Sequence, residues 1–195
     1  SGFKVHYGPI RASDLPVFLD SGLKATPQMR RKTFTLWERM VLIPIELVTA
    51  LKIATLAMPA MFVIAGTIGD GTFLSSAVMY SPYPVLCFIG AIITGTVFFP
   101  MLLPLLPGRA FSLKGFILGA AAALILLSLK LPVRSPADLV ESLAWLLLVP
   151  AFTAYMAMNF TGASTYTSLT GVKKEMLWAV PTEAGMALAG IILWI

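Results

Sequence analysis

The chain has 195 residues, of which 58% are hydrophobic and 12% charged, and its mean hydropathy is +0.88. A soluble domain carries about twice that share of charged residues, and a disordered chain needs high charge with low hydrophobicity, so an integral membrane protein remains. The net charge of +5 does not indicate nucleic-acid binding, because the basic residues flank apolar spans, where they determine topology. One cysteine and one histidine exclude an internal disulfide and a multi-histidine site.

Residues 1–34 are the most water-compatible stretch of the chain. Residues 3–7 alternate apolar and polar side chains, which is typical of a β-strand. Ser13 is predicted to cap a short helix that covers Asp14–Asp20 and ends at Gly22. One strand and one short helix cannot bury a core by themselves. We therefore interpret this stretch as the C-terminal end of a soluble domain, followed by a linker.

Residues 35–195 are predicted to form a five-helix transmembrane domain, because they contain five apolar stretches near the roughly 20 helical residues that cross a bilayer. Thr35 and Glu38 have the spacing of a capping box at the start of the first helix. Ser135 is expected to cap the fourth, with Pro136 at its first position and Asp138 in its first turn. The predicted spans cover residues 35–68, 83–106, 112–131, 135–159 and 175–195.

The basic residues orient these spans. If the N-terminus is cytoplasmic, eleven of the fourteen Lys and Arg side chains lie inside and two outside, with Lys52 within or near the membrane. The positive-inside rule therefore places the N-terminal stretch and residues 159–174 in the cytoplasm. The C-terminus then lies at the outer face.

Charged residues within the spans are candidates for function, since a charge at membrane depth is costly unless it is paired or hydrated. Glu46, Lys52 and Glu141 lie near the predicted interfaces, where snorkelling accounts for them. Glu183 lies deeper in the fifth span. A proton or ion path and a polar packing contact are both open for this residue.

A hydroxyl-rich stretch follows the fourth span and is predicted to be a loop that docks a partner or an anion. The alternative is an ordinary polar connection whose lysines hold the topology. The candidate docking residues are Asn159, Thr161, Ser164, Thr165, Tyr166, Thr167, Lys173 and Lys174.

Two strings carry a resemblance: YGPIRASDLPVFLDSGLKATPQMRRKTFTLWERMVLIPIEL, residues 7–47, and NFTGASTYTSLTGVKKEM, residues 159–176. Both resemble the family of mercury-methylating corrinoid proteins, HgcA. The resemblance runs through the chain in order, from the end of that family's corrinoid-binding domain through its membrane domain. The second string is the more specific, because the first is also similar to the corrinoid iron–sulfur proteins of acetyl-CoA metabolism.

This resemblance implies an all-α membrane bundle of five helices, preceded by a short strand and helix that remain from an α/β corrinoid-binding domain. It implies an inner-membrane protein of an anaerobe with the corrinoid domain in the cytoplasm. In that family a methyl group on the corrinoid cobalt is transferred to Hg(II), giving methylmercury. A ferredoxin-like iron–sulfur partner, HgcB, is expected to return the cobalt to its reduced state.

The sequence departs from the family in one respect. The motif Asn-Trp-Cys-Ala-(Ala/Gly)-Gly-Lys, whose cysteine lies at the lower face of the cobalt, does not occur in it. Cys87 stands in a predicted span, and His6 lacks the Asp-x-His-x-x-Gly pattern, so neither takes the ligand role. We expect no catalytic, cofactor-binding or metal-binding residue in this chain, and the corrinoid on a domain that precedes Ser1 or is lost.

Two other functions stay open. The chain could be a non-catalytic membrane anchor that docks a corrinoid or ferredoxin partner. Less favoured is a small transporter that uses Glu183 and the proline-broken spans. The oligomeric state is also open.

Overall fold

A computed structural model describes residues 2, 5–68, 71–130, 132, 135–160 and 169–195. The described residues form helices and contain no strand. They divide into two compact units, Ser1–Thr35 and Leu36–Ile195.

The N-terminal unit contains one short helix. A 3-10 turn, η1 (Ala12–Asp14), leads into α1 (Leu15–Asp20). The prediction that Ser13 caps the helix is wrong, because the chain enters the 3-10 turn before the helix starts and Ser13 lies inside that turn. The helix is followed, as predicted, by Gly22 in the left-handed region, with φ +71°.

Little is buried in this unit. Phe18 is the one buried side chain among its described residues. The Ile10 amide donates to the Met29 carbonyl at 2.9 Å, which closes the segment around α1. The predicted strand is not found: residues 5–7 have no regular structure, and residues 3 and 4 lie outside the described part. A strand needs a neighbour to hydrogen-bond with, and the described residues of the unit offer none.

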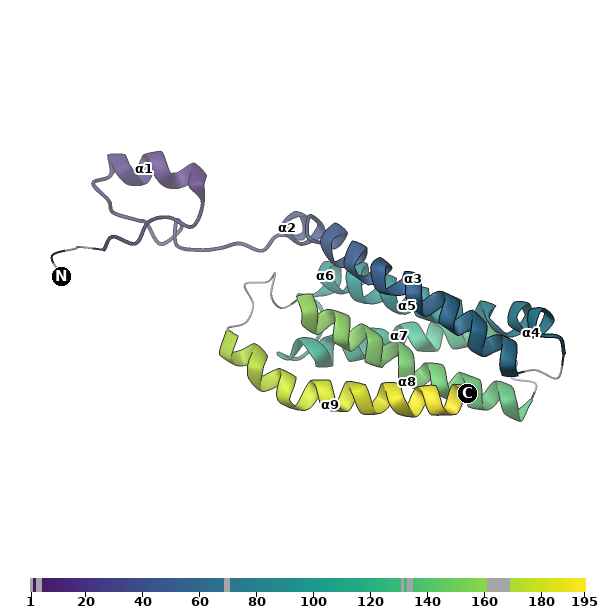
Figure 1. Ribbon diagram of the computed structural model, residues 1–195. Coiled ribbons are helices and arrows are strands. Elements are labelled where there is room, and N and C mark those ends of the chain that lie inside the picture. The colour runs from purple at the N-terminus through teal and green to yellow at the C-terminus, as the bar shows by residue number, and fades with distance from the viewer. Residues whose placement is uncertain (1, 3–4, 69–70, 131, 133–134, 161–168) are drawn as a thin grey trace. The chain divides into compact units, whose positions relative to one another are not determined.

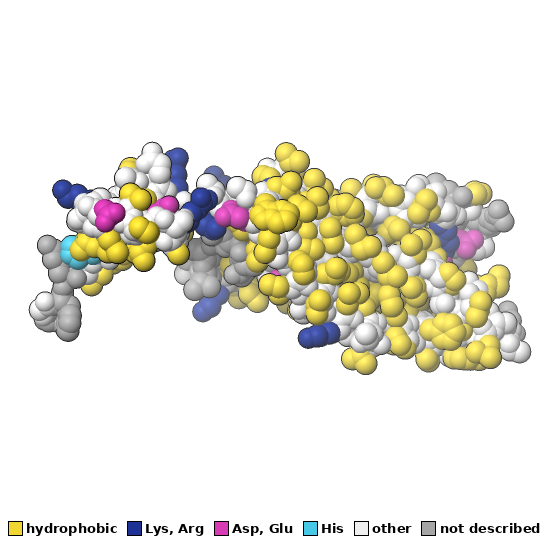
Figure 2. All heavy atoms as spheres, turned by 90° about the horizontal axis from the view of Figure 1, so that it is seen from above, with side chains coloured by type: hydrophobic (Ala, Val, Ile, Leu, Met, Phe, Trp, Pro, Cys, Tyr) yellow, Lys and Arg dark blue, Asp and Glu magenta, His cyan; other side chains and the backbone are white. Residues whose placement is uncertain are grey.

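The second unit is a helical bundle whose described residues include five helices long and apolar enough to cross a membrane, which agrees with the predicted number and order of spans. The chain is therefore a multi-pass membrane protein. Most of the bundle surface in Figure 2 is hydrophobic, as lipid contact requires. Its elements are α2 (Leu36–Met40), α3 (Ile43–Ile68), α4 (Phe73–Tyr80), α5 (Pro82–Ile93), η2 (Thr94–Phe98), α6 (Phe99–Leu102), α7 (Phe111–Lys130), α8 (Pro136–Asn159) and α9 (Leu169–Trp194).

Helix α8 is the centre of the bundle. It shares its largest interfaces with α7 and α9 and runs between α3 and α9 over much of its length (Figure 1). Two glycines of α7 allow the close approach to α8. A Cβ on Gly115 would lie 2.9 Å from the Thr153 carbonyl oxygen, and one on Gly119 would lie 2.7 Å from the Pro150 Cα. Small residues at such contacts are what helix packing in lipid relies on.

Two spans are less regular than predicted. The first begins at Leu36, directly after Thr35, but is interrupted between α2 and α3. The second contains the π-helical segment η2, which lies directly before α6. Pro100 is the second residue of α6 and has no amide hydrogen for the carbonyl four residues earlier, so the wider π turn accommodates it.

Helix α4 was not predicted. It is a short helix on the connection between the first two spans, and the Thr72 side chain caps it by accepting from the Ser75 amide. Its Phe73 ring lies against Gly66 of α3, where a Cβ would come within 2.8 Å of the ring. Such a short helix is not stable alone, and its contacts with α3 and α5 hold it in position.

The start of α8 agrees with the prediction and the start of α9 does not. The Ser135 hydroxyl accepts from the Asp138 amide at 3.1 Å, and the Asp138 carboxylate accepts from the Ser135 amide at 3.1 Å, a complete capping box. Helix α9 begins at Leu169 rather than at Glu175. Lys173 and Lys174 are therefore helical and do not belong to a loop.

Candidate functional site

The most polar buried contacts lie at one end of the bundle, where α6 and α8 end and α7 and α9 begin; we call it the Glu175 end. The backbone amide of Ser112 donates to the Glu175 carboxylate at 2.6 Å, and both residues are buried. The first amides of a helix need an acceptor, and Ala110, which precedes α7, has no side-chain oxygen to offer. Glu175 of α9 therefore caps α7 from another helix.

A second charged side chain serves the end of α6. The Lys114 ammonium donates to the Leu103 carbonyl at 3.1 Å, and Lys114 is buried. The last carbonyls of a helix lack partners and favour a cation. Lys114 falls within the predicted third span, and its sequence position gives no sign of this contact. For Glu175, the sequence signal was that Ala110 before α7 has no side-chain oxygen, which indicates that a residue from elsewhere caps this helix.

Three phenylalanines form a buried cluster beside these contacts. The Phe99 ring centroid lies 6.0 Å from that of Phe111 and 6.2 Å from that of Phe160. All three side chains are at most 2% exposed. Phe160 and Glu175 are thus both fixed to the bundle, on either side of the hydroxyl-rich stretch.

The structure locates three of the predicted docking residues. Asn159 is exposed at the end of α8 and lines a cavity of about 170 Å³ together with Glu46 of α3. Lys173 and Lys174 are exposed on the first turns of α9. The other five lie outside the described residues: Thr161, Ser164, Thr165, Tyr166 and Thr167.

The opposite end of the bundle, the Lys130 end, carries an ion cluster. The Lys130 ammonium contacts the Glu141 carboxylate, lies 3.7 Å from Asp138 and lies 4.7 Å from the centre of the Tyr83 ring. Glu141 is therefore paired and does not simply snorkel. The cluster joins α5, α7 and α8.

Lys130→Met is expected to destabilise the bundle by about 2 kcal/mol, because two carboxylates lose their cation. The free energy of unfolding in detergent micelles measures this. Lys174→Met, on an exposed side chain, serves as the control and should change it by less than about 0.5 kcal/mol. Equal effects of the two variants would contradict a stabilising role of the cluster.

The three intramembrane candidates, Glu46, Lys52 and Glu183, differ in their burial. Glu46 on α3 is partly buried, and Lys52 on the same helix is exposed. Glu183 on α9 is 8% exposed, and neither of its carboxylate oxygens has a hydrogen-bond partner among the described residues. No ion pair joins any two of these three side chains in the described part of the chain.

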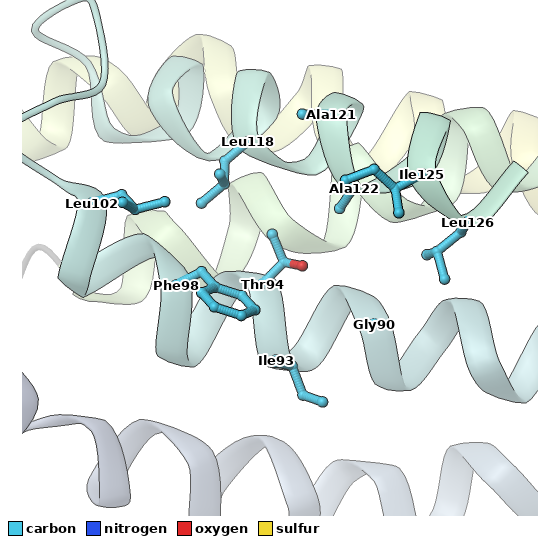
Figure 3. A pocket seen from close by; sticks show the side chains of 10 residues that line it. All are labelled: Gly90, Ile93, Thr94, Phe98, Leu102, Leu118, Ala121, Ala122, Ile125 and Leu126. Atoms are coloured by element: carbon cyan, nitrogen blue, oxygen red, sulfur yellow. The ribbon is translucent and has the colours of Figure 1, made fainter. Parts of the chain in front are cut away.

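A third feature is an apolar cavity of about 280 Å³ between α5–α6 and α7 (Figure 3). Its lining side chains are aliphatic or aromatic except for Thr94, whose hydroxyl is the one oxygen among them. Such a cavity has room for a hydrocarbon chain. It offers no titratable group for catalysis.

Neither Cys87 nor His6 is placed to hold a corrinoid in the part of the chain that the structure describes. Cys87 is fully buried in α5, so its thiol cannot reach a cobalt outside the bundle. His6 is exposed in the N-terminal unit, and the described residues contain no cluster of three His, Cys, Asp or Glu side chains. No step of a reaction is therefore assigned to a corrinoid held by this chain.

The fold and these contacts define a multi-pass α-helical membrane protein with a polar, internally capped end. No protein-family model, no curated protein and no solved structure matches this chain.

Proposed function

We propose that this chain is the membrane domain of a corrinoid-dependent methyltransferase, which transfers a methyl group from corrinoid cobalt to Hg(II) and gives methylmercury. The resemblance of residues 7–47 and 159–176 to HgcA supports it. One observation carries the proposal further: parts of both strings lie at the Glu175 end. α2 packs against α6 there, and Glu46 and Asn159, one from each string, line the same cavity.

In this proposal the residues of this chain hold and orient the domain that carries the corrinoid. The positive-inside distribution puts the Glu175 end at the cytoplasmic face of the inner membrane, with the N-terminal unit on the same side. The corrinoid is held by another domain, so Hg(II) and the methyl group meet outside the residues of this chain. The Glu175 end braces that domain, or the ferredoxin-like partner HgcB, through the stretch between Phe160 and Glu175.

The test compares three strains of an anaerobe that carries the gene: the parent, a deletion, and a variant whose product lacks residues 36–195. Methylmercury formed from added Hg(II) is the measurement. We expect none from the deletion strain and a large reduction without the membrane domain. Unchanged methylmercury in the deletion strain would overturn the proposal.

The anchor alternative makes a different prediction for the same strains. If residues 36–195 only localise the protein, lysates of the parent and of the truncated strain should methylate Hg(II) at equal rates. If the membrane domain takes part in docking, the lysate of the truncated strain should stay slow.

The hydroxyl-rich stretch gives a further prediction. Replacing Thr161, Thr165 and Thr167 by alanine should lower both methylmercury formation and co-purification of HgcB, while membrane insertion stays normal. The control replaces Thr55 and Thr67, exposed threonines of the first span, by alanine. If the two variants behave alike, the stretch is only a connection.

The transport alternative depends on Glu183. It predicts that proteoliposomes carry a proton or ion flux that Glu183→Gln abolishes. A flux that the substitution leaves unchanged would exclude this role.

A further inference from the structure

The N-terminal unit carries an excess of positive charge. Among its described residues, five exposed Lys and Arg side chains outnumber two carboxylates, which gives a net charge of +3. The basic residues are Arg11, Lys24, Arg30, Arg31 and Lys32, and the acidic ones are Asp14 and Asp20. Arg11, Lys24, Arg30 and Arg31 form no ion pair within the described part of the chain. These four charges are therefore available to a ligand.

Two contacts close the chain of this unit on itself and gather its arginines. The Ile10 amide donates to the Met29 carbonyl at 2.9 Å, and the Arg11 guanidinium donates to the Thr33 hydroxyl. Arg11 therefore lies beside the two arginines that follow Met29. A guanidinium has five N–H donors, so the bond to Thr33 leaves most of them free for a ligand.

A turn holds Arg30 and Arg31 in place. The Met29 amide donates to the Thr26 hydroxyl at 3.3 Å, and the Arg31 amide donates to the Gln28 carbonyl at 3.1 Å. Both arginine side chains are exposed at this turn. We call Arg11, Arg30 and Arg31 the basic cluster.

The basic cluster is tied to the start of a membrane span. Leu36, the first residue of that span, lies five residues after Arg31. Even a fully extended chain keeps the two residues within about 18 Å of one another. Since the headgroup layer extends several ångströms beyond the hydrocarbon core, the cluster is held within reach of the lipid headgroups.

The positive-inside rule explains only part of this cluster. The rule counts basic residues within about 15–20 residues of a span. Arg30 and Arg31 fall within that range, whereas Arg11 lies 25 residues before Leu36. The fold of the unit, through the contact with Thr33, adds this third charge. The cluster therefore indicates a ligand in addition to its effect on topology.

We propose that Arg11, Arg30 and Arg31 bind the phosphate groups of anionic phospholipids and hold the N-terminal unit at the membrane surface. A guanidinium donates two parallel N–H bonds to phosphate oxygens, which makes arginine well suited to this ligand. The positive-inside distribution places the unit at the cytoplasmic leaflet, whose anionic lipids give it a negative surface potential. Basic residues next to a span are attracted to such a surface.

An acidic protein is the other ligand that these charges would accept. The lipid is favoured because the span fixes the basic cluster beside the leaflet. Anionic headgroups are then present at high effective concentration without a further partner having to bind. The inference does not depend on the proposed function.

The first test places the full chain in vesicles of phosphatidylcholine alone or mixed with phosphatidylglycerol. A dye is attached at Gln28→Cys, in a background with Cys87→Ala, because the Gln28 side chain is exposed and only its backbone carbonyl holds the turn. Spin-labelled headgroups, which quench over short distances, report when the unit lies on the surface. We expect stronger quenching with phosphatidylglycerol, and loss of the difference at about 1 M salt, where the Debye length is about 3 Å.

Arg30→Gln with Arg31→Gln should remove most of this effect. A basic residue near an anionic surface contributes about fivefold to binding, so the pair should shift the equilibrium about 25-fold toward the free unit. The matched control is Lys173→Gln with Lys174→Gln, which removes two exposed charges predicted on the same side of the membrane. It should leave quenching unchanged. Equal losses in the two double variants would overturn the proposal.

A second measurement needs no label. Native mass spectrometry of the protein extracted in mild detergent should show retained phosphatidylglycerol, and fewer retained molecules for the arginine variant than for the lysine control. Equal quenching in the two kinds of vesicle, or equal retention in the two variants, would contradict lipid binding. An acidic protein would then be the ligand of the basic cluster.

Discussion

Gly115→Ala is expected to destabilise the bundle by about 1–3 kcal/mol, although alanine by itself favours a helix by about 1 kcal/mol over glycine. The added Cβ would lie 2.8 Å from the Ala154 Cα and 2.9 Å from the Thr153 carbonyl oxygen. Both are backbone atoms of α8, which cannot rotate away as a side chain can. The two helices must move apart, and the largest interface of the bundle loosens.

The measurement is the free energy of unfolding in mixed micelles, followed by tryptophan fluorescence. Gly185→Ala is the matched control, since it is also a helical glycine in a span but its Cβ would meet nothing within 4 Å. It should leave stability unchanged or raise it by up to about 1 kcal/mol. If both substitutions change the free energy of unfolding in the same direction, the close contact of α7 with α8 is not what limits stability.

Glu175→Ala is the second large expected effect, a loss of about 2–3 kcal/mol of unfolding free energy. The variant leaves the buried Ser112 amide without its acceptor and removes the contact that ties the start of α9 to α7. We also expect faster proteolysis near the start of α9, because that turn has lost its anchor. Limited proteolysis with mass spectrometry, alongside the unfolding measurement, checks both effects.

Two variants separate the cap from a general effect of charge. Glu175→Gln keeps a side-chain oxygen that can accept from Ser112. It should therefore lose at most half as much unfolding free energy as Glu175→Ala. Lys173→Ala, on an exposed neighbour, should change stability by less than about 0.5 kcal/mol. If Glu175→Ala had no larger effect than Lys173→Ala, the contact would not support the helix ends.

The contacts of Glu175 with Ser112 and of Lys114 with Leu103 bear on the proposed function. The Glu175 end has capped helix termini and a buried phenylalanine cluster, and both flanks of the hydroxyl-rich stretch are fixed to it. A rigid base is what a docking segment needs, because less ordering then accompanies binding. Under the proposed function, Glu175→Ala should lower co-purification of the proposed partner HgcB as well as stability. Its loss of stability should exceed that of the triple threonine variant.

The sequence by itself determined the features that depend on local pattern. The lengths of the apolar stretches predicted five spans, and the residues Ser135, Pro136 and Asp138 predicted the start of α8. A membrane span needs its own uninterrupted hydrophobicity, and a capping box uses residues three apart, so both signals lie within one segment. The expected function came from the likeness of two strings to one family and is still a proposal.

Only the tertiary structure decided which distant residues meet. Glu175 accepts from the amide of Ser112, 63 residues before it, and Lys130 pairs with Glu141 of the next helix. The early start of α9, the short helix α4 and the glycine contacts of α7 likewise depend on a neighbouring helix. Local sequence carries no record of these neighbours, because a buried charge is satisfied by whatever group the packing of the helices brings within hydrogen-bonding distance.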